Sequence, residues 1–592
     1  MRKHIDPILR DVRPITRRII EEKKLPKKSR KRVRLPKKLA RPLFVVALAT
    51  LVLAVSIFSI RFLFQNESEQ ASFGGLKNLV GALVGISSDI NELKTEGFDF
   101  AFNGRGEEFI ATLENLRANV AKLDALKVGF IGESTLSTAS GGLGALIALL
   151  GKPGEQHLLI LFLNPSEMRP IGGFAGSYGD VTLERGSIKN IKVNDIYYPD
   201  HFLNKKITPP IQLQTVTVDW GARDAAWFFD FPTSARKTIE FIEASQIYAK
   251  DGVRFDGAIA INVKVIEDIL TLTGPIKLPE YGLTLTKDNF LEEVQREVEE
   301  GRDKQVGENP KRVLASLAPI LIERLHQLSS SDKNTLALAL FSRVTNKDIQ
   351  FYFSDPKVEN FVRKVNWAGE VASLPENVGG DYLAVVDTNI AGGKTDARIN
   401  QSIKLKSEID SIGQVNNYLA VTRRHFGKDN EAPWYRAKNQ NFIKVFTVPN
   451  AELLSLSGAT PKNVHPRIDY ESAGYSRDPL VESLERTQKN ISRYNTETYL
   501  ESGKSVFAAW FSTLAGESKV LEVDYKGTQL SLADGMKYRF VFDKQSGVES
   551  AFQYELVAPA GYRWQETNGS TFAYRSDTIP ARLELELTLV RD

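Results

Sequence analysis

The residues best suited to chemistry in this chain lie in one stretch, LLILFLNPSEMRPIGGFAGSYGD, at positions 158–180. A run of aliphatic residues typical of a strand ends at Asn164, and Glu167, Arg169 and four glycines follow it. Glycine-rich backbone can turn its N–H groups toward a bound anion, which Arg169 would also contact. Alternatively, the glycines only turn the chain, and Arg169 pairs with Glu167. The first interpretation makes Arg169 catalytic and assigns ligand binding to Asn164, Glu167, Gly172 and Gly173.

A second cationic position is Lys311-Arg312, in the first turn of a helix that we expect to begin after Asn309-Pro310. The helix dipole disfavours each cation there by roughly 0.3–1 kcal/mol, and a bound anion would reverse that effect. The alternative is that both side chains are simply solvated. The anion hypothesis predicts that Lys311 binds ligand, that Arg312 is catalytic, and that Arg169 faces them across an apolar slot.

Carboxylates bracket the segment that follows the strand. Asp180 and Asp195 could hold Mg²⁺ beside a phosphate, because that cation prefers oxygen ligands, and Asp195 could also take part in catalysis. Aspartate is equally common in turns, where it binds its own backbone. The six histidines are too scattered to form a triad or a zinc site, and the H-E-x-x-H and G-x-S-x-G motifs are absent.

Two absences narrow the chemistry further. The chain has no cysteine, which excludes disulfides, thiol catalysis and thiolate metal sites. The GGKT at 392–395 is not a phosphate-binding P-loop, because the first glycine of that motif would fall on Thr388.

The N-terminus predicts a membrane anchor. Residues 1–42 form a strongly basic tail, and residues 43–64 are almost uncharged and long enough to cross a bilayer as a helix. The basic tail then stays in the cytoplasm and the rest of the chain lies outside the cell membrane. Membrane lipid is the expected partner, and nucleic acid is not expected.

Beyond the anchor, the pattern predicts a multidomain α+β protein. Apolar residues at helical spacing predict a helical stalk at 65–150, and alternating strands and helices predict an α/β domain at 151–395. A hairpin is expected about residues 184–187, and a helix with Thr233 or Ser234 as its cap follows. Strands dominate 396–592 and predict a β-sandwich region, interrupted near 471–496 by a polar insert that is helical or mobile.

Two motifs carry a family resemblance. The stretch containing Asn164, Glu167, Arg169 and Gly172-Gly173-Phe174, together with DTNIAGGKTD at 387–396, closely resembles the bacterial domain-of-unknown-function family four-zero-one-two. The resemblance extends over roughly residues 75 to 590. It implies a large, single-pass membrane-anchored envelope protein with no assigned activity.

The order of elements also resembles the LytR-CpsA-Psr family of extracytoplasmic phosphotransferases, although the Pro-Arg-Asp signature of that family is absent. The counterparts of its motifs would be Arg169, NDIYYPD with Asp195, RFDGAIAIN, and NPKRVLASL with Arg312. This resemblance implies a LytR-CpsA-Psr-like α/β fold that binds or transfers polyprenyl-phosphate-linked glycopolymers during cell-wall assembly, with Mg²⁺ as the cofactor. The alternative is a non-catalytic cell-surface scaffold or adhesion protein.

Overall fold

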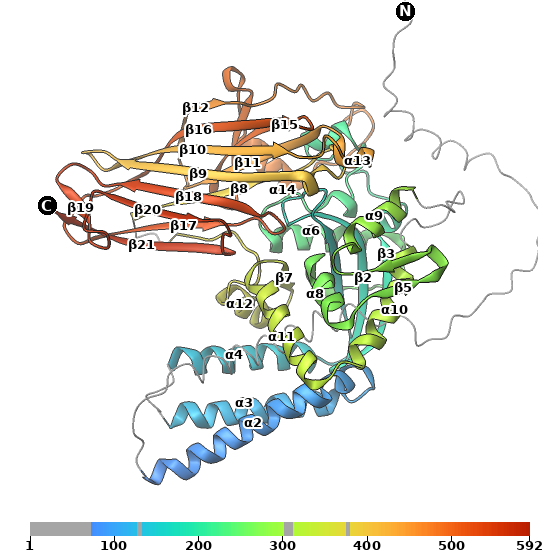
Figure 1. The fold of residues 1–592 in the computed structure, drawn as a ribbon. Helices are drawn as coiled ribbons and strands as arrows, with labels where there is room; N and C mark the ends of the chain where they lie inside the picture. Colours follow the sequence, from blue (N-terminus) through green and yellow to red (C-terminus); the bar gives the residue numbers. More distant parts are fainter. Residues whose placement is uncertain (1–72, 127–132, 301–311, 375–378) are drawn as a thin grey trace, which may run out of the picture. The chain divides into compact units, whose positions relative to one another are not determined.

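The computed structural model describes residues 73–126, 133–300, 312–374 and 379–592, which form helices and four β-sheets (Figure 1). The helices are α2 (Phe73–Phe102), α3 (Gly106–Ala125), α4 (Glu133–Leu150), α5 (Tyr197–Asp200), α6 (Phe231–Ala244), α7 (Gln246–Ala249), α8 (Lys264–Thr273), α9 (Phe290–Glu300), α10 (Arg312–His326), α11 (Ser330–Thr345), α12 (Pro356–Lys364), α13 (Pro433–Arg436) and α14 (Pro479–Thr487). The first strands are β1 (Glu155–Asn164), β2 (Phe174–Glu184), β3 (Ser187–Asp195), β4 (Phe255–Asn262), β5 (Ile276–Leu278), β6 (Leu283–Leu285) and β7 (Ile349–Phe353).

The remaining strands belong to the C-terminal part of the chain. They are β8 (Gly379–Val386), β9 (Ile399–Ile409), β10 (Gln414–His425), β11 (Asn439–Thr447), β12 (Glu452–Ser457), β13 (Lys489–Ile491), β14 (Thr496–Glu501), β15 (Lys504–Thr513), β16 (Ser518–Gln529), β17 (Met536–Asp543), β18 (Ser550–Val557), β19 (Tyr562–Trp564), β20 (Thr571–Ser576) and β21 (Arg582–Arg591).

The first large sheet has five strands in the order β3-β2-β1-β4-β7. Strand β1 pairs antiparallel with β2 and parallel with β4. Successive side chains of a strand point to opposite faces, so Leu158 and Ile160 enter one hydrophobic core while Leu159 and Leu161 enter another. Burial on both faces explains why β1 is apolar without interruption.

Helices α2, α3 and α4 pack against this sheet. Leu113 of α3 and Leu146 of α4 belong to the same core as Leu158 of β1. The backbone N–H of Gly106 donates to Oγ of Ser187 at 2.8 Å, which joins the start of α3 to the β2–β3 hairpin. These helices are therefore part of the α/β core and not a separate stalk.

The C-terminal strands form two stacked sheets. One has eight strands in the order β13-β14-β15-β11-β8-β17-β21-β19, and the other has six in the order β12-β16-β10-β9-β18-β20. Side chains from both sheets share one core, which includes Val445 of β11, Val523 of β16 and Phe552 of β18. The sequence prediction assigned 379–386 to the α/β domain, whereas β8 lies inside the eight-stranded sheet between β11 and β17.

The other face of the eight-stranded sheet packs on the α/β part of the chain. Trp227 stacks on Phe442 of β11 with ring centroids 6.1 Å apart. Beside them, Lys444 and Glu501 form a fully buried ion pair with Nζ and Oε2 at 3.0 Å. Lys444 also donates to the carbonyl of Trp227 at 3.1 Å, and Glu501 accepts the N–H of Phe229 at 2.9 Å. The sheet is thus covered on both sides.

The fold class predicted from the sequence is wrong. No described helix is long and apolar enough to cross a membrane, and the predicted anchor at 43–64 and tail at 1–42 lie outside the described residues. The described chain is a mixed α/β protein with several sheets, in which the stalk helices and the β-rich region both pack on the α/β part. An apolar stripe predicts that a helix face is buried, but it does not identify the partner, and this explains the error about the stalk.

The buried Lys444–Glu501 pair predicts a large loss of stability when one charge is removed. Glu501→Gln leaves the Lys444 ammonium buried without a counter-charge, which costs about 3–5 kcal/mol. Glu452→Gln is the matched control, because its pair with Lys526 has the same 3.0 Å separation but is exposed, and such pairs contribute about 0–1 kcal/mol. Thermal and denaturant unfolding of the full chain should separate the two variants. Equal effects would contradict the role given to burial.

Candidate functional site

The loop after β1, residues 164–174, is held by its own backbone. Asn164 ends β1, and its side-chain Oδ1 accepts the N–H of Ser166 at 3.0 Å. Gly172 and Gly173 have φ of +113° and +145°, a region that residues with a Cβ rarely adopt. A Cβ on Gly173 would lie 2.6 Å from the carbonyl of Asn164. These glycines therefore turn the chain tightly back toward β2, as the alternative interpretation of the sequence predicted.

Arg169 is buried, with only 6% of its surface exposed. One Nη nitrogen donates to the carbonyl of Asn389 and the other to Oε1 of Glu167 at 3.0 Å. Oδ1 of Asp224 lies 3.8 Å from the same guanidinium, which also stacks 5.2 Å from the ring of Phe174. Of the three guanidinium nitrogens of Arg169, only Nε has no hydrogen-bond partner among the described residues. The protein's own groups thus fill the space where the sequence predicted an anion.

Glu167 lies between two cations. Its carboxylate pairs with Arg169 on one oxygen and with Lys394 on the other. Burial opposes ionisation of this carboxyl, but the ammonium of Lys394 and the guanidinium of Arg169 outweigh that effect and lower the pKa of Glu167. The three side chains are paired through the single carboxylate of Glu167, and the further carboxylate of Asp224 lies 3.8 Å from Arg169.

The loop at 387–396 locks onto the loop at 164–174, and we call the two segments together the two-loop junction. The N–H of Asn389 donates to the carbonyl of Met168 at 2.9 Å, and the N–H of Met168 donates to Oδ2 of Asp396 at 3.0 Å. Arg423 of β10, fully buried, binds both Asp387 and Asp396. Burial raises the pKa of Asp387, and Arg423 partly offsets that rise. The junction therefore joins the α/β part to both C-terminal sheets.

A third segment closes the two-loop junction from the β17–β18 connection. Nε2 of Gln545 donates to the carbonyls of Arg169 and Asp387, both at 2.9 Å. A Cβ on Gly172 would lie 2.4 Å from Oγ of Ser546, so this connection packs directly on the glycine turn. Gly172 is thus required for close backbone packing.

The predicted metal ligands Asp180 and Asp195 do not come together. Asp195 pairs across the sheet with Ser177, three residues before Asp180 on β2, so the two carboxylates point to opposite faces. Asp180 is buried and binds Nδ1 of His157 at 2.9 Å, while Asp195 accepts the N–H of Tyr197 at 3.0 Å. Among the described residues, no group of three or more His, Cys, Asp or Glu side chains could hold a metal ion.

The predicted partner of Arg169 at the start of α10 belongs to a different part of the fold. Arg312 is the first residue of α10, and Lys311 lies outside the described residues. Val313, the next residue of α10, is in the helical core on one face of the five-stranded sheet, whereas Phe174 of the two-loop junction is in the core on the other face. Lys311 and the side chain of Arg312 lie outside what the structure describes, so the cradle across an apolar slot stays a prediction.

The residues that sequence reasoning missed are the counter-charges of Arg169 and Glu167. Lys394 stands in GGKT, where only its mismatch to a P-loop was considered, and Asp224 stands in an aromatic-rich loop. The dense mixture of Asp, Asn, Thr and Lys at 387–396, directly after the apolar strand β8, was the available signal. Buried polar groups need partners, so two such loops in one chain indicate mutual contact.

The fold and the two-loop junction define a mixed α/β protein whose two polar motifs pair with each other inside the molecule. Residues 153–298, from β1 to α9, match the model of the family described as "Protein of unknown function (DUF4012)". This match confirms, for residues 153–298, the resemblance to that family predicted from the sequence.

No curated protein matches this chain. The solved structures that match include protein gbs0355 from Streptococcus agalactiae, at 12% identity and a TM-score of 0.22, covering 38% of this chain and 75% of that one. The transcriptional regulator yvhJ from Bacillus subtilis matches at 13% identity and a TM-score of 0.18, covering 37% of this chain and 98% of that one. The LytR-CpsA-Psr resemblance stays a prediction from the sequence.

The glycine turn predicts a specific destabilisation. Gly173→Ala forces a Cβ against the backbone of Asn164 at a strained φ, and we expect a loss of about 1–3 kcal/mol. Gly81→Ala is the control, because Gly81 lies exposed in α2 with open space around it, and alanine there stabilises a helix by up to about 1 kcal/mol. Denaturant unfolding should move in opposite directions for the two variants. A neutral Gly173→Ala would show that the turn tolerates a side chain.

His157 and Asp180 predict a pH dependence of stability. The hydrogen bond to Asp180 raises the pKa of His157 despite its partial burial, so protonated His157 stabilises the fold. That contribution is present below pH about 6.5, the unfolded value, and disappears as the pH rises through the folded value. His157→Gln should lose stability most at acidic pH, and the difference from wild type should shrink toward alkaline pH. The exposed His201→Gln is the control, and a constant difference for His157→Gln would contradict the assignment.

Proposed function

We propose that the protein is a non-catalytic scaffold or adhesion protein of the cell envelope. Its two polar loops, at 164–174 and 387–396, hold the molecule together, and its surface binds the partners. The extracytoplasmic location belongs to the same proposal and rests on the resemblance to envelope proteins.

One observation carries this proposal: both Nη nitrogens of the Arg169 guanidinium already donate to protein groups, which leaves Nε alone without a partner among the described residues. A phosphate would have to displace the Asn389 carbonyl and compete with the Glu167 carboxylate for the same nitrogens. Breaking a buried charge–carboxylate pair is costly, and the hydrogen bonds of a charged group contribute about 1.5–3 kcal/mol each. Among the described residues, the cations at this position, Arg169 and Lys394, both pair with Glu167, so neither is free to hold the pyrophosphate of a polyprenyl-linked glycopolymer.

The packing of the C-terminal sheets supports the scaffold interpretation. The eight-stranded sheet shares one core with the α/β part and another with the six-stranded sheet. Buried polar contacts cross the first of these interfaces, because Lys347 pairs with Asp543 and Lys444 donates to the carbonyl of Trp227. A molecule built this way presents surfaces from distant segments in a fixed arrangement, which is what a scaffold needs.

The variant Arg169→Ala distinguishes the scaffold proposal from the phosphotransferase hypothesis. We expect it to destabilise the full chain by at least about 1–3 kcal/mol, because Oε1 of Glu167 and the buried carbonyl of Asn389 lose their donor. Arg254→Ala is the control, since Arg254 is an exposed arginine paired with Glu243, and its loss should have little effect.

The same variants should be melted with and without Mg²⁺ plus pyrophosphate. The scaffold proposal predicts no change in the melting temperature of the wild type, whereas a site saturated 100-fold above its Kd would stabilise by about 2.7 kcal/mol. Stabilisation of the wild type that is lost in Arg169→Ala would overturn the proposal in favour of the phosphotransferase.

A further inference from the structure

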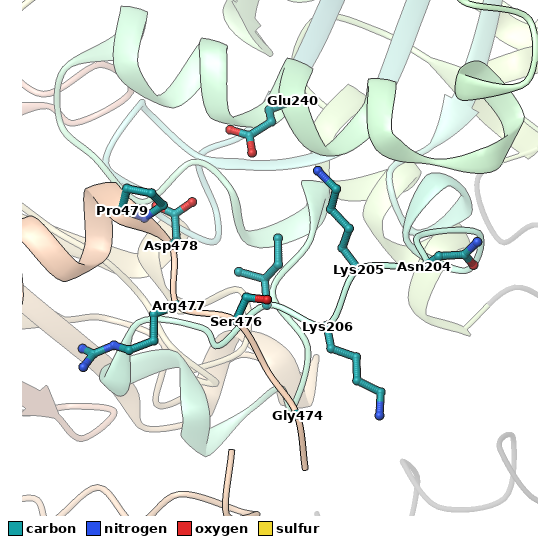
Figure 2. Close-up of a pocket in the computed structure, with 10 residues that line it drawn as sticks. Asn204, Lys205, Lys206, Glu240, Gly474, Ser476, Arg477, Asp478 and Pro479 are labelled. Carbon is teal, nitrogen blue, oxygen red and sulfur yellow. The ribbon is translucent and has the colours of Figure 1, made fainter. Parts of the chain in front are cut away.

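A solvent-open cavity of about 580 Å³ lies away from the two-loop junction (Figure 2). Two segments that are far apart in sequence form its walls, residues 204–207 after α5 and residues 474–479 before α14. Glu240 of α6 completes the lining. The volume is within the roughly 300–1,000 Å³ of small-molecule sites.

The walls of this cavity are fixed by backbone hydrogen bonds. The N–H of Ser476 donates to the carbonyl of Lys206, and the N–H of Thr208 donates to the carbonyl of Ser476, both at 2.9 Å. The hydroxyl of Tyr475 donates to Oδ1 of Asp219 at 2.6 Å. These contacts hold the two segments side by side, so the cavity is preformed.

One buried cation organises the carboxylates of the cavity. Nζ of Lys237 lies 2.6 Å from Oε2 of Glu240 and 2.6 Å from Oδ2 of Asp478. Asp478 also caps α14 by accepting the N–H groups of Leu480 and Val481. The two acids are therefore held in place as hydrogen-bond acceptors, and half of their charge is compensated by Lys237.

The rest of the lining supplies donors. Lys205 and Asn204 are exposed and have no ion pair or hydrogen bond with any described residue, and Figure 2 shows Lys205 extended toward the helix that carries Glu240. The hydroxyl of Ser476 lies between them and Asp478 in the same view. Arg477 pairs with Glu485, so it adds little net charge.

This composition selects against several kinds of ligand. Only Ile207 and Pro479 contribute sizeable apolar side chains to the lining, which does not suit a lipid chain. The lining sets Lys205 and Lys206 against Glu240 and Asp478, so it has no large excess of positive charge to bind a polyanion such as a nucleic acid. A ligand rich in hydroxyl groups fits best, because each hydroxyl needs a donor and an acceptor when it leaves water.

An aromatic side chain stands at the rim. The ring of Tyr475 is half-buried beneath Nζ of Lys206, at 5.7 Å from the ring centroid, and packs on Tyr470 at 5.1 Å. Tyr198 and Phe202 are exposed just before the 204–207 wall. Because these rings pack on Lys206, on Tyr470 or on each other, the donors and acceptors of the lining, and not ring stacking, would recognise a ligand.

From these observations we infer that the cavity between residues 204–207 and 474–479 binds a neutral oligosaccharide. Lys205, Asn204 and Ser476 donate to its hydroxyl oxygens, and the half-exposed carboxylate of Glu240 accepts from its hydroxyl groups. The inference does not depend on the scaffold proposal, because the cavity shares no residue with the two-loop junction.

The test is titration calorimetry of the full chain with chitotetraose and maltotetraose as neutral probes and tetragalacturonate as the acidic probe. We expect at least one neutral probe to bind at sub-millimolar Kd, with little dependence on salt. Failure of both neutral probes to bind at millimolar concentration would overturn the inference. Tighter, salt-sensitive binding of tetragalacturonate would also overturn it, in favour of an anionic glycan.

Variants of the lining residues test whether the oligosaccharide binds in the cavity. The double variant Asn204→Ala/Lys205→Ala should weaken binding at least about tenfold, the effect of losing about 1.4 kcal/mol. Ser476→Phe should abolish binding by filling the space, while its backbone hydrogen bonds remain. Lys250→Ala, an exposed lysine outside the cavity, is the matched control and should bind as the wild type does. Unchanged binding in both cavity variants, with wild-type melting temperatures, would place the sugar elsewhere.

Discussion

The structure depends on compensating the positive charge of one buried guanidinium, that of Arg169. Arg169 leaves water almost completely, and an isolated charge in that position would cost several kcal/mol. Glu167 and the carbonyl of Asn389 compensate it, and Lys394 compensates Glu167 in turn. Each group is satisfied only when the loop at 164–174 and the loop at 387–396 are together. The α/β part and the C-terminal sheets are therefore coupled through electrostatics as well as through apolar burial.

The same constraint recurs wherever the eight-stranded sheet meets its neighbours. A sheet covered on both faces has few exposed positions for polar residues, yet β11 and β14 place Lys444 and Glu501 in its interior. Asp543, at the end of β17, is equally buried and binds Arg582 and the hydroxyl of Tyr382. Apolar contacts supply most of the stabilisation, while paired charges are satisfied only when the layers are aligned in one way.

Local structure was predictable from the sequence because local rules decide it. The hairpin expected about residues 184–187 is confirmed, with β2 ending at Glu184 and β3 starting at Ser187, because Arg185 and Gly186 take the positive φ values of a tight turn. The N-cap of α6 was predicted at Thr233 or Ser234, but Asp230 caps the helix and Pro232 lies in its first turn. A proline after an aspartate was the stronger signal.

The candidate site was harder to predict, because its chemistry depends on contacts between distant segments. The sequence identified Arg169, Glu167 and the glycines as special, and it left open whether Glu167 was the partner of Arg169. It could not reveal that a carbonyl 220 residues away occupies the guanidinium. An arginine among glycines has the same local pattern whether it faces a phosphate or another loop. Only the pairing of two polar motifs distinguishes the cases, and that pairing has no local signature.

This distinction bears on where function is found in such a protein. Residues that are chemically unusual and satisfied by one another stabilise the fold, and they have little capacity left for a ligand. Residues that line a cavity and whose donors pair with no described residue, such as Asn204 and Lys205, retain that capacity. The polar stretch near 471–496 contributes both to stability and to binding capacity, because Asp478 caps α14 while Ser476 remains open to the cavity. Binding capacity therefore lies at the surface where this stretch meets the α/β part. The polar loops at 164–174 and 387–396 stabilise the fold that positions this surface.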